Sequence, residues 1–343
     1  MKISLKIILF LATLFCLQFN SFAQWTNGQA AVRVAGASDY TSVGSLYGTG
    51  IAIDVTNQKM YISDMCDNTV KRYPLTTGSL AASPVAEATF GTSATAGTSQ
   101  TLLKSPSGLG VDNTGRLFIV DGGNHRVVYI NSANSASSGA SFSGVLGQAN
   151  YTSGSANSGG SAANNTFNFA ISSPSGIFSC TPTSYAGGYI AVASTNAIFV
   201  SDPGNNRVLR FDAPSTTSTA AAVIGQTTMS GTSSATSQST LYTPMGVAIN
   251  GTTLYIADMN NNRVVRYNSA TTLSTGTNNA SGVYGATSWA APGSGGRSAT
   301  LLDLPINVAV DGGGRLYIND SNNGRTVYIN SASTKDGSGG TAV

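Results

Sequence analysis

This 343-residue sequence has little charge, because only 9% of its residues are Asp, Glu, Lys or Arg, whereas a typical soluble domain has roughly a quarter. Glu87 is its one glutamate and His125 its one histidine. Disorder driven by charge requires low hydrophobicity and high net charge, and a coiled coil requires many Glu, Lys and Arg residues. The composition excludes both classes. The formal net charge of +3 also excludes the extended basic surface that binds nucleic acid.

Long apolar runs are rare as well, and the one that stands out is at the N-terminus. Lys2 and Lys6 precede an apolar stretch at residues 7–19, and a Ser-Phe-Ala sequence ends at Ala23. This order is typical of a secretory signal peptide. A membrane anchor is the alternative, but the run is shorter than the roughly 18 to 20 apolar residues of a bilayer span.

We therefore predict a signal peptide at residues 1–23 and a mature domain at residues 24–343 with no membrane span. Removal of the signal takes two of the 17 basic side chains and leaves a nearly neutral body with 14 acidic ones. The predicted location is secreted, extracellular or at the cell surface, with the periplasm as the alternative.

Glycine is abundant, with 40 residues, and it accompanies an internal repeat of five units. In each unit a short apolar segment ends in an aspartate: Asp64, Asp121, Asp202, Asp258 and Asp320. Five positions after each aspartate come Thr69, Arg126, Arg207, Arg263 and Arg325. Self-similarity of this kind is the signature of a repeat architecture. We place the repeat cores at residues 48–75, 105–130, 173–212, 243–268 and 304–330.

Each unit contains the pattern of four short strands. In the fourth unit, residues 246–249 are small and apolar, residues 254–257 are rich in β-forming side chains, and residues 263–267 alternate. A Val-x-Gly type segment, such as residues 222–225, supplies an outer strand. No segment outside the signal has a helical period. The predicted fold is all-β, a β-propeller of four-stranded antiparallel blades, five of which are counted.

The repeat also resembles a known family. The sequence PMGVAI at residues 244–249, followed by LYIADMNNNRVVRY at residues 254–267, is similar to the NHL repeat, and Asn124-His125-Arg126 resembles the part that names it. The resemblance covers all five units and implies an NHL-repeat β-propeller of the secreted bacterial type. Thr69, Asn307 and Gly324 depart from the pattern, and unit three contains an insert. Propellers of this family are usually six-bladed, whereas five units are visible here.

Two ways of ending the ring remain open. Residues 31–36 (AVRVAG) have the pattern of an outer strand and would complete the fifth blade from the N-terminus. Alternatively, residues 340–343 reach the point at which another outer strand begins, so the chain would be part of a larger, six-bladed propeller. We favour closure by the N-terminal strand.

The repeated Asp and Arg residues are predicted to be structural, because a catalytic group is needed once and these occur in every blade. Aspartate accepts backbone N–H groups in tight turns, and arginine donates several hydrogen bonds. His125 occupies the position of Asn206 and Asn262 in later units, so the repeat explains it. The resemblance also implies an alternative, because related propeller hydrolases and lyases bind metals through several histidines or inward-facing carboxylates. One histidine is too few for such a zinc site, and we predict no catalytic residue, no metal and no cofactor.

A central channel is predicted where the first strand of each blade begins. Its ring of candidate binding residues is uncharged: Thr49, Ser107, Ser175, Met245 and Ile306. Asp54, Asp112 and Asp311 lie at the other end of these strands, with Cys180 and Asn250 in the matching positions. This acidic rim is either a weak calcium site or a set of turn caps, and we favour turn caps.

Of the three cysteines, Cys16 lies in the signal and leaves Cys66 and Cys180 in an oxidising compartment. The repeat places Cys66 after a second strand and Cys180 at the end of a first strand. These positions lie on opposite faces and two blades apart, whereas a disulfide needs Cα atoms within about 7 Å. We therefore predict that these two cysteines do not pair.

The variable parts of the sequence are the loops at residues 92–105, 149–173, 227–243 and 286–304, which are rich in Ser, Thr, Gly and Asn. Loops on a rigid scaffold often carry recognition. Tyr151, Tyr242 and Trp289 are candidate contacts, through stacking on sugar rings or packing on a partner protein. For Phe167 and Phe169 we expect packing against the blades.

These observations predict an exported, monomeric and non-catalytic scaffold that binds a protein or a cell-surface glycan through its loop-rich face. The alternative is a metal-assisted propeller hydrolase or lyase. No nucleotide motif supports a different reading, because the Gly-Leu-Gly sequence at residues 108–110 begins a strand and does not lead into a helix.

Overall fold

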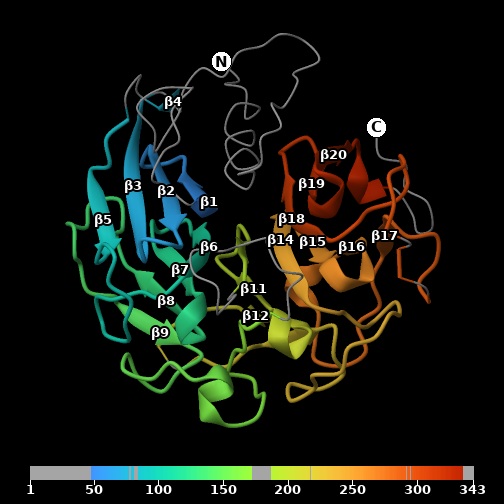
Figure 1. Cartoon of the computed structure of the whole chain (residues 1–343), viewed down its shortest axis with the longest axis horizontal. Coiled ribbons are helices and arrows are strands. Elements are labelled where there is room, and N and C mark those ends of the chain that lie inside the picture. Colours follow the sequence, from blue (N-terminus) through green and yellow to red (C-terminus); the bar gives the residue numbers. More distant parts are fainter. Residues whose placement is uncertain are drawn as a thin grey trace.

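Short antiparallel strands form five sheets around a common axis in the computed structural model, which describes residues 48–76, 79–80, 84–171, 187–216, 218–290, 292–293 and 295–334. Figure 1 shows the blades in chain order, from blue through green and orange to red, with β1, β6, β14 and β18 nearest the centre. Each blade pairs its strands in sequence order, except that β5 of blade 1 pairs with β3. The predicted all-β propeller of antiparallel blades is confirmed.

The strands of each blade are as follows. Blade 1 contains β1 (Gly48–Asp54), β2 (Lys59–Asp64), β3 (Thr69–Thr76), the two-residue β4 (Ser79–Leu80) and β5 (Ala88–Gly91). Blade 2 contains β6 (Pro106–Val111), β7 (Leu117–Asp121), β8 (Arg126–Ile130) and β9 (Gly144–Leu146). Blade 3 contains β10 (Ile190–Val192), β11 (Ile198–Asp202), β12 (Arg207–Phe211) and β13 (Ala222–Ile224). Blade 4 contains β14 (Pro244–Asn250), β15 (Thr253–Asp258), β16 (Arg263–Tyr267) and β17 (Gly282–Tyr284). Blade 5 contains β18 (Pro305–Val310), β19 (Leu316–Asp320) and β20 (Arg325–Ile329).

Short 3₁₀ turns connect these strands. Four of them link the second and third strands of a blade: η1 (Gly122–Asn124), η3 (Pro203–Asn205), η4 (Met259–Asn261) and η6 (Ser321–Asn323). The others are η2 (Ala156–Gly159), η5 (Ala270–Thr272) and η7 (Ala332–Thr334). Among the described residues, no helix has the length and apolarity that crossing a bilayer requires.

Blade 5 has three strands among the described residues. The predicted closing strand at residues 31–36 and the tail at residues 340–343 both lie outside the described part of the chain, as does the predicted signal peptide. Closure by the N-terminal strand therefore stays a prediction, and so does its alternative, a cut inside a larger propeller.

The core lies between the blades, because the alternating side chains of each strand pack against two neighbours. In β7, Leu117 and Ile119 join an apolar cluster with blade 1, whereas Phe118 and Val120 join one with blade 3. All four side chains are fully buried. A strand that is apolar on both faces fits a blade in the middle of a stack, as in other sheets covered on both sides.

Two glycines show how closely the inner strands approach one another. A Cβ atom on Gly108 would lie 2.5 Å from the Cα atom of Tyr189 in the next blade. A Cβ atom on Gly246 would lie 2.5 Å from the Cα atom of Asn307. Both neighbours are backbone atoms and cannot rotate away. Glycine is therefore required here for close approach of the backbones.

The inner strand of blade 3 differs from the sequence-based assignment. We predicted residues 176–180, but β10 (Ile190–Val192) pairs with β11. Gly188 takes the ring position assigned to Ser175, since it accepts a hydrogen bond from Ser107 Oγ. Ala193 takes the position assigned to Cys180, and its N–H donates to Ala197 O across a short turn. The predicted segment and β10 are both small and apolar, and the segment nearer to β11 in sequence forms the hairpin.

The same reassignment removes one premise of the prediction for the cysteines. Cys66 is disulfide-bonded, and its partner lies outside the described residues. Whether Cys66 pairs with Cys180, which we predicted it does not, is therefore not tested. Cys180 was predicted at the end of an inner strand, a position that Ala193 occupies after β10. Cys16 and Cys180 both lie outside the described residues.

Candidate functional site

An aspartate and an arginine are paired at the loop end of each of blades 2 to 5. In blade 2, Asp121 ends β7 and Arg126 begins β8, and Arg126 Nε donates to Asp121 Oδ2 at 2.7 Å. The turn η1 and the left-handed conformation of His125 return the chain over this short distance. The equivalent pairs are Asp202–Arg207 at 2.6 Å, Asp258–Arg263 at 2.7 Å and Asp320–Arg325 at 2.7 Å. In blades 2 to 4 both side chains are completely buried.

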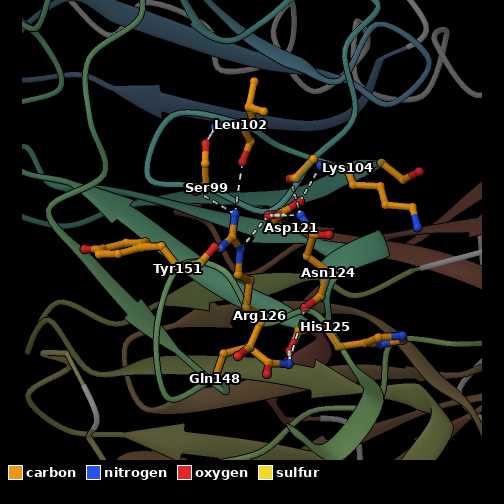
Figure 2. A network of polar contacts seen from close by, with 12 residues as sticks. Ser99, Leu102, Lys104, Asp121, Asn124, His125, Arg126, Gln148 and Tyr151 are labelled. Carbon is orange, nitrogen blue, oxygen red and sulfur yellow. Dashed lines mark hydrogen bonds and ion pairs between the residues drawn. The ribbon is translucent and has the colours of Figure 1, made fainter. Parts of the chain in front are cut away.

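The guanidinium group of each arginine in blades 2 to 4 also holds two loops. Arg126 Nη2 donates to Ser99 O at 3.1 Å and Leu102 O at 3.0 Å, in the loop before the blade. Its Nη1 donates to Tyr151 O, in the loop after the blade (Figure 2). Arg207 forms the same bridge, from Thr166 O to Met229 O. Arg263 bridges Thr240 O and Trp289 O. The buried arginines therefore set the conformation of the loops.

The second carboxylate oxygen anchors the segment that enters each blade. Asp Oδ1 accepts the backbone N–H of Lys104 at 2.6 Å, and of Asn168, Tyr242 and Asp303 at 2.7 Å. We call these four residues the entry ring. Their backbones are held identically, but their side chains are a cation, an amide, a phenol and a carboxylate. Each of the four side chains is half-buried or exposed.

Burial dominates the ionisation of these aspartates. It raises the pKa of Asp121, Asp202 and Asp258 above the ordinary carboxyl value, while the neighbouring arginine and asparagine act in the opposite direction. A buried carboxylate without such partners would be unstable in its charged form. The arginine is therefore the partner that makes a charged group tolerable at this depth.

A second set of buried side chains, which sequence analysis missed, joins consecutive blades. Arg210 on β12 donates to Ala270 O at 3.1 Å and Leu273 O at 2.7 Å in blade 4. Arg72 reaches Ala133 O and Arg266 reaches Ala332 O in the same way. At the equivalent position of β8, Tyr129 Oη accepts the N–H of Thr216. All of these residues lie eight positions after the repeated aspartate, and that spacing was the available signal.

The predicted channel ring is packed between blades. Ser107, Met245 and Ile306 are buried. Thr49 is half-buried, and its Oγ1 donates to Pro106 O at 3.1 Å. Ser175 lies outside the described residues. These side chains contact neighbouring blades, so a ligand role for them stays a prediction that their burial does not favour.

The predicted loop aromatics differ in exposure. Tyr151 and Trp289 are partly buried and pack against the core, and Tyr151 Oη donates to Phe142 O at 3.2 Å. Phe167 and Phe169 are fully buried and stacked with ring centroids 5.0 Å apart, as we expected for residues that pack on the blades. Tyr242, which is 41% exposed, is the member of the set that is available to a ligand.

The acidic rim consists of turn caps where the structure describes it. Asp112 Oδ1 accepts the N–H groups of Thr114 and Arg116 at 2.9 and 3.0 Å. Asp54 accepts the N–H of Asn57 at 2.8 Å, and Asp311 accepts that of Arg315 at 2.9 Å. Within the described part of the chain, no three His, Cys, Asp or Glu residues lie close enough together to hold a metal ion.

Comparison with known proteins agrees with this architecture. The model of the NHL repeat matches residues 103–128, the segment that enters blade 2 and contains Asp121 and most of Arg126's strand. The chain is a β-propeller with an NHL repeat in its second blade. No curated protein matches the sequence of this chain.

Several solved structures resemble this propeller at low sequence identity. A chain in the crystal structure of a Nidogen/Laminin complex has a TM-score of 0.50 and 14% identity, over 85% of this chain and 79% of that one. A functionally unknown protein from Desulfotomaculum acetoxidans DSM 771 has a TM-score of 0.50 and 12% identity, over 87% and 68%. A gluconolactonase from Xanthomonas campestris has a TM-score of 0.46 and 14% identity, over 87% and 77%. At these identities the first two comparisons establish the fold alone.

Proposed function

We propose that this protein is an exported, non-catalytic scaffold that binds a protein or a cell-surface glycan through its loop face. The entry ring carries the proposal. Four equivalent backbone positions are anchored to buried aspartates, and they present Lys104, Asn168, Tyr242 and Asp303. A constant backbone with different side chains is the arrangement in which binding specificity varies without a change in the scaffold.

The chemistry of the ring favours a glycan. An exposed tyrosine offers an aromatic face, while an amide, a carboxylate and an ammonium group offer donors and acceptors for hydroxyl groups. Asp303 Oδ2 already accepts a hydrogen bond from Asn322 Nδ2 at 2.7 Å, which orients its carboxylate. The arginine-held loops reduce the entropy lost when a ligand is bound.

The test is retention of the labelled mature protein on an array of polysaccharides. Tyr242→Ala and Asp303→Ala should each reduce retention at least about tenfold, the effect of losing roughly 1.4 kcal/mol. Both residues are anchored through backbone N–H groups, so these substitutions leave the anchor in place. Tyr328→Ala is the matched control, because Tyr328 on β20 is similarly exposed at 37% and lies away from the ring. Equal loss in the control, or no retention on any glycan, would contradict the proposal.

Metal analysis of the same preparation separates this function from the alternative. Stoichiometric calcium or zinc in the purified protein, with loss of a hydrolase or lyase activity on chelation, would support the metal-assisted enzyme. Retention on a glycan that is unchanged by chelation would support the scaffold.

A further inference from the structure

One side chain in each of blades 1 to 4 fastens that blade to the next. The residue that follows the turn after the second strand has a left-handed backbone and accepts a backbone N–H from the segment that enters the following blade. Asn206 Oδ1 accepts Thr243 N at 2.8 Å, and Asn262 Oδ1 accepts Leu304 N at 2.8 Å. Asn68 Oδ1 accepts Ser105 N at 2.9 Å. We call this contact the clasp.

Blade 2 forms the clasp with a histidine. His125 Nδ1 accepts the N–H of Phe169 at 2.9 Å. An imidazole nitrogen accepts a hydrogen bond only while it carries no proton, so this geometry assigns the neutral ring with its proton on Nε2. The amides of Asn68, Asn206 and Asn262 do not titrate. The contact between blades 2 and 3 is therefore the one clasp, among the four described, that acid can break.

The surroundings of His125 hold the ring in this state. The ring is half-buried and lies parallel to Phe169, with centroids 6.5 Å apart, and it points away from the Arg126 network (Figure 2). The backbone is fixed on the other side by Gln148 Nε2, which donates to His125 O at 3.1 Å. Protonation would thus turn Nδ1 into a donor that faces the N–H donor of Phe169.

The charges that face His125 oppose its protonation. Burial and the positive charge of Lys104 lower the pKa of His125 below its usual value. Asp121 and Arg126, next to it in the same turn, neutralise each other. The segment packed against the ring supplies Asn168, Phe169 and Ala170, none of which titrates.

We propose that His125 is a pH-sensitive fastener, whose protonation releases the segment entering blade 3 from blade 2. The sign follows from linkage. The pKa of the histidine is lower when the clasp is formed than when it is released. The stability of the clasp is therefore unchanged above the pKa of the released state, near 6.5 for an ordinary histidine, and decreases as the pH falls below that value. Release would free Phe169 N–H and loosen Asn168, a member of the entry ring, in mildly acidic surroundings.

Nuclear magnetic resonance tests this directly, because one histidine gives one imidazole signal to follow. We expect that signal to titrate below its usual pH and the protection factor of the Phe169 amide to fall between pH 7.5 and pH 5. After correction for intrinsic exchange, protection should fall by up to about tenfold for each unit by which the histidine pKa lies below its usual value.

Two substitutions keep the proposal falsifiable. His125→Asn reproduces the clasp of blades 1, 3 and 4, so it should fold and keep Phe169 protected at both pH values. Asn206→His transfers a titratable clasp to blade 3 and should make the Thr243 amide lose protection in acid. An unchanged acid loss at Phe169 in His125→Asn, or a wild-type Phe169 amide that stays protected while the histidine titrates, would overturn it.

Discussion

In blade 1, Lys71 pairs with the repeated aspartate Asp64, as an arginine does in the other blades, although Lys71 lies two residues after the arginine position. Its Nζ lies 3.1 Å from Asp64 Oδ2, where the other blades place an arginine Nε. The arginine position itself holds Thr69. Lys71 has no guanidinium group with which to bridge two loops, and Asp67 instead holds the following loop by accepting Ser93 Oγ at 2.6 Å and Ala94 N at 3.0 Å. The blade therefore requires a cation near the buried carboxylate and not one fixed residue.

Loss of this cation should destabilise the fold. We predict that Lys71→Ala lowers the free energy of unfolding by about 2 kcal/mol, because the completely buried Asp64 carboxylate would lose the ammonium group of Lys71. Lys59→Ala is the control, since its partner Glu87 is partly exposed, and it should cost under about 1 kcal/mol. Chemical denaturation of both variants gives the comparison. Equal losses would show that Asp64 does not depend on Lys71.

The repeated aspartate should contribute most to the free energy of unfolding in the blades where its arginine partner is most buried. We predict that Asp258→Ala costs about 3 to 5 kcal/mol, because Arg263 would remain buried without a counter-charge. The same substitution at Asp320 should cost less, since the side chain of Arg325 is 30% exposed and water can solvate it. The midpoints of denaturant unfolding rank the two variants. The reverse order would contradict a role for burial.

The side chains eight positions after the repeated aspartate should join neighbouring blades without stabilising the loops that the repeated arginines hold. Arg210→Met removes the hydrogen bonds to Ala270 O, which is buried, and to Leu273 O, which is partly buried, and should cost about 1 to 3 kcal/mol. Hydrogen exchange should rise around η5 in blade 4 more than around the loops held by Arg207. Uniform loss of protection over blade 3 alone would indicate a contribution inside the blade instead.

Close approach of the inner strands gives a steric prediction. Gly108→Ala should cost about 1 to 3 kcal/mol, because the added Cβ atom would meet the backbone of Tyr189. Gly312→Ala is the matched control, as its Cβ atom would have nothing within 4 Å, and it should change stability by no more than about 0.5 kcal/mol. Thermal unfolding of both variants is sufficient. Tolerance of alanine at Gly108 would mean that the blades separate more easily than this packing indicates.

Sequence reasoning predicted the hairpin formed by the second and third strands well. The Asp at the end of β7 and the Arg at the start of β8 are five residues apart, and the strand pattern between them is local. It failed in blade 3, where two small apolar segments precede β11 and the repeat pattern alone does not choose between them. That error carried over to the positions assigned to Ser175 and Cys180.

The candidate site was only partly accessible from sequence. The loops and Tyr242 were identified, but Trp289 and Tyr151 have the same composition around them and turn out to be packed on the core. The entry ring has no sequence signature, because its members share a backbone contact and not a residue type.

The sequence by itself determined the repeat, the blade and the buried Asp–Arg pair, since these depend on residues a few positions apart. Only the tertiary structure decided which segment lies against β11, which loop carbonyls the arginines reach, and that His125 accepts a hydrogen bond from Phe169. The physical reason is that such contacts join different blades. A hydrogen bond over about 3 Å between residues that are 44 positions apart depends on how blades pack, which no local pattern records.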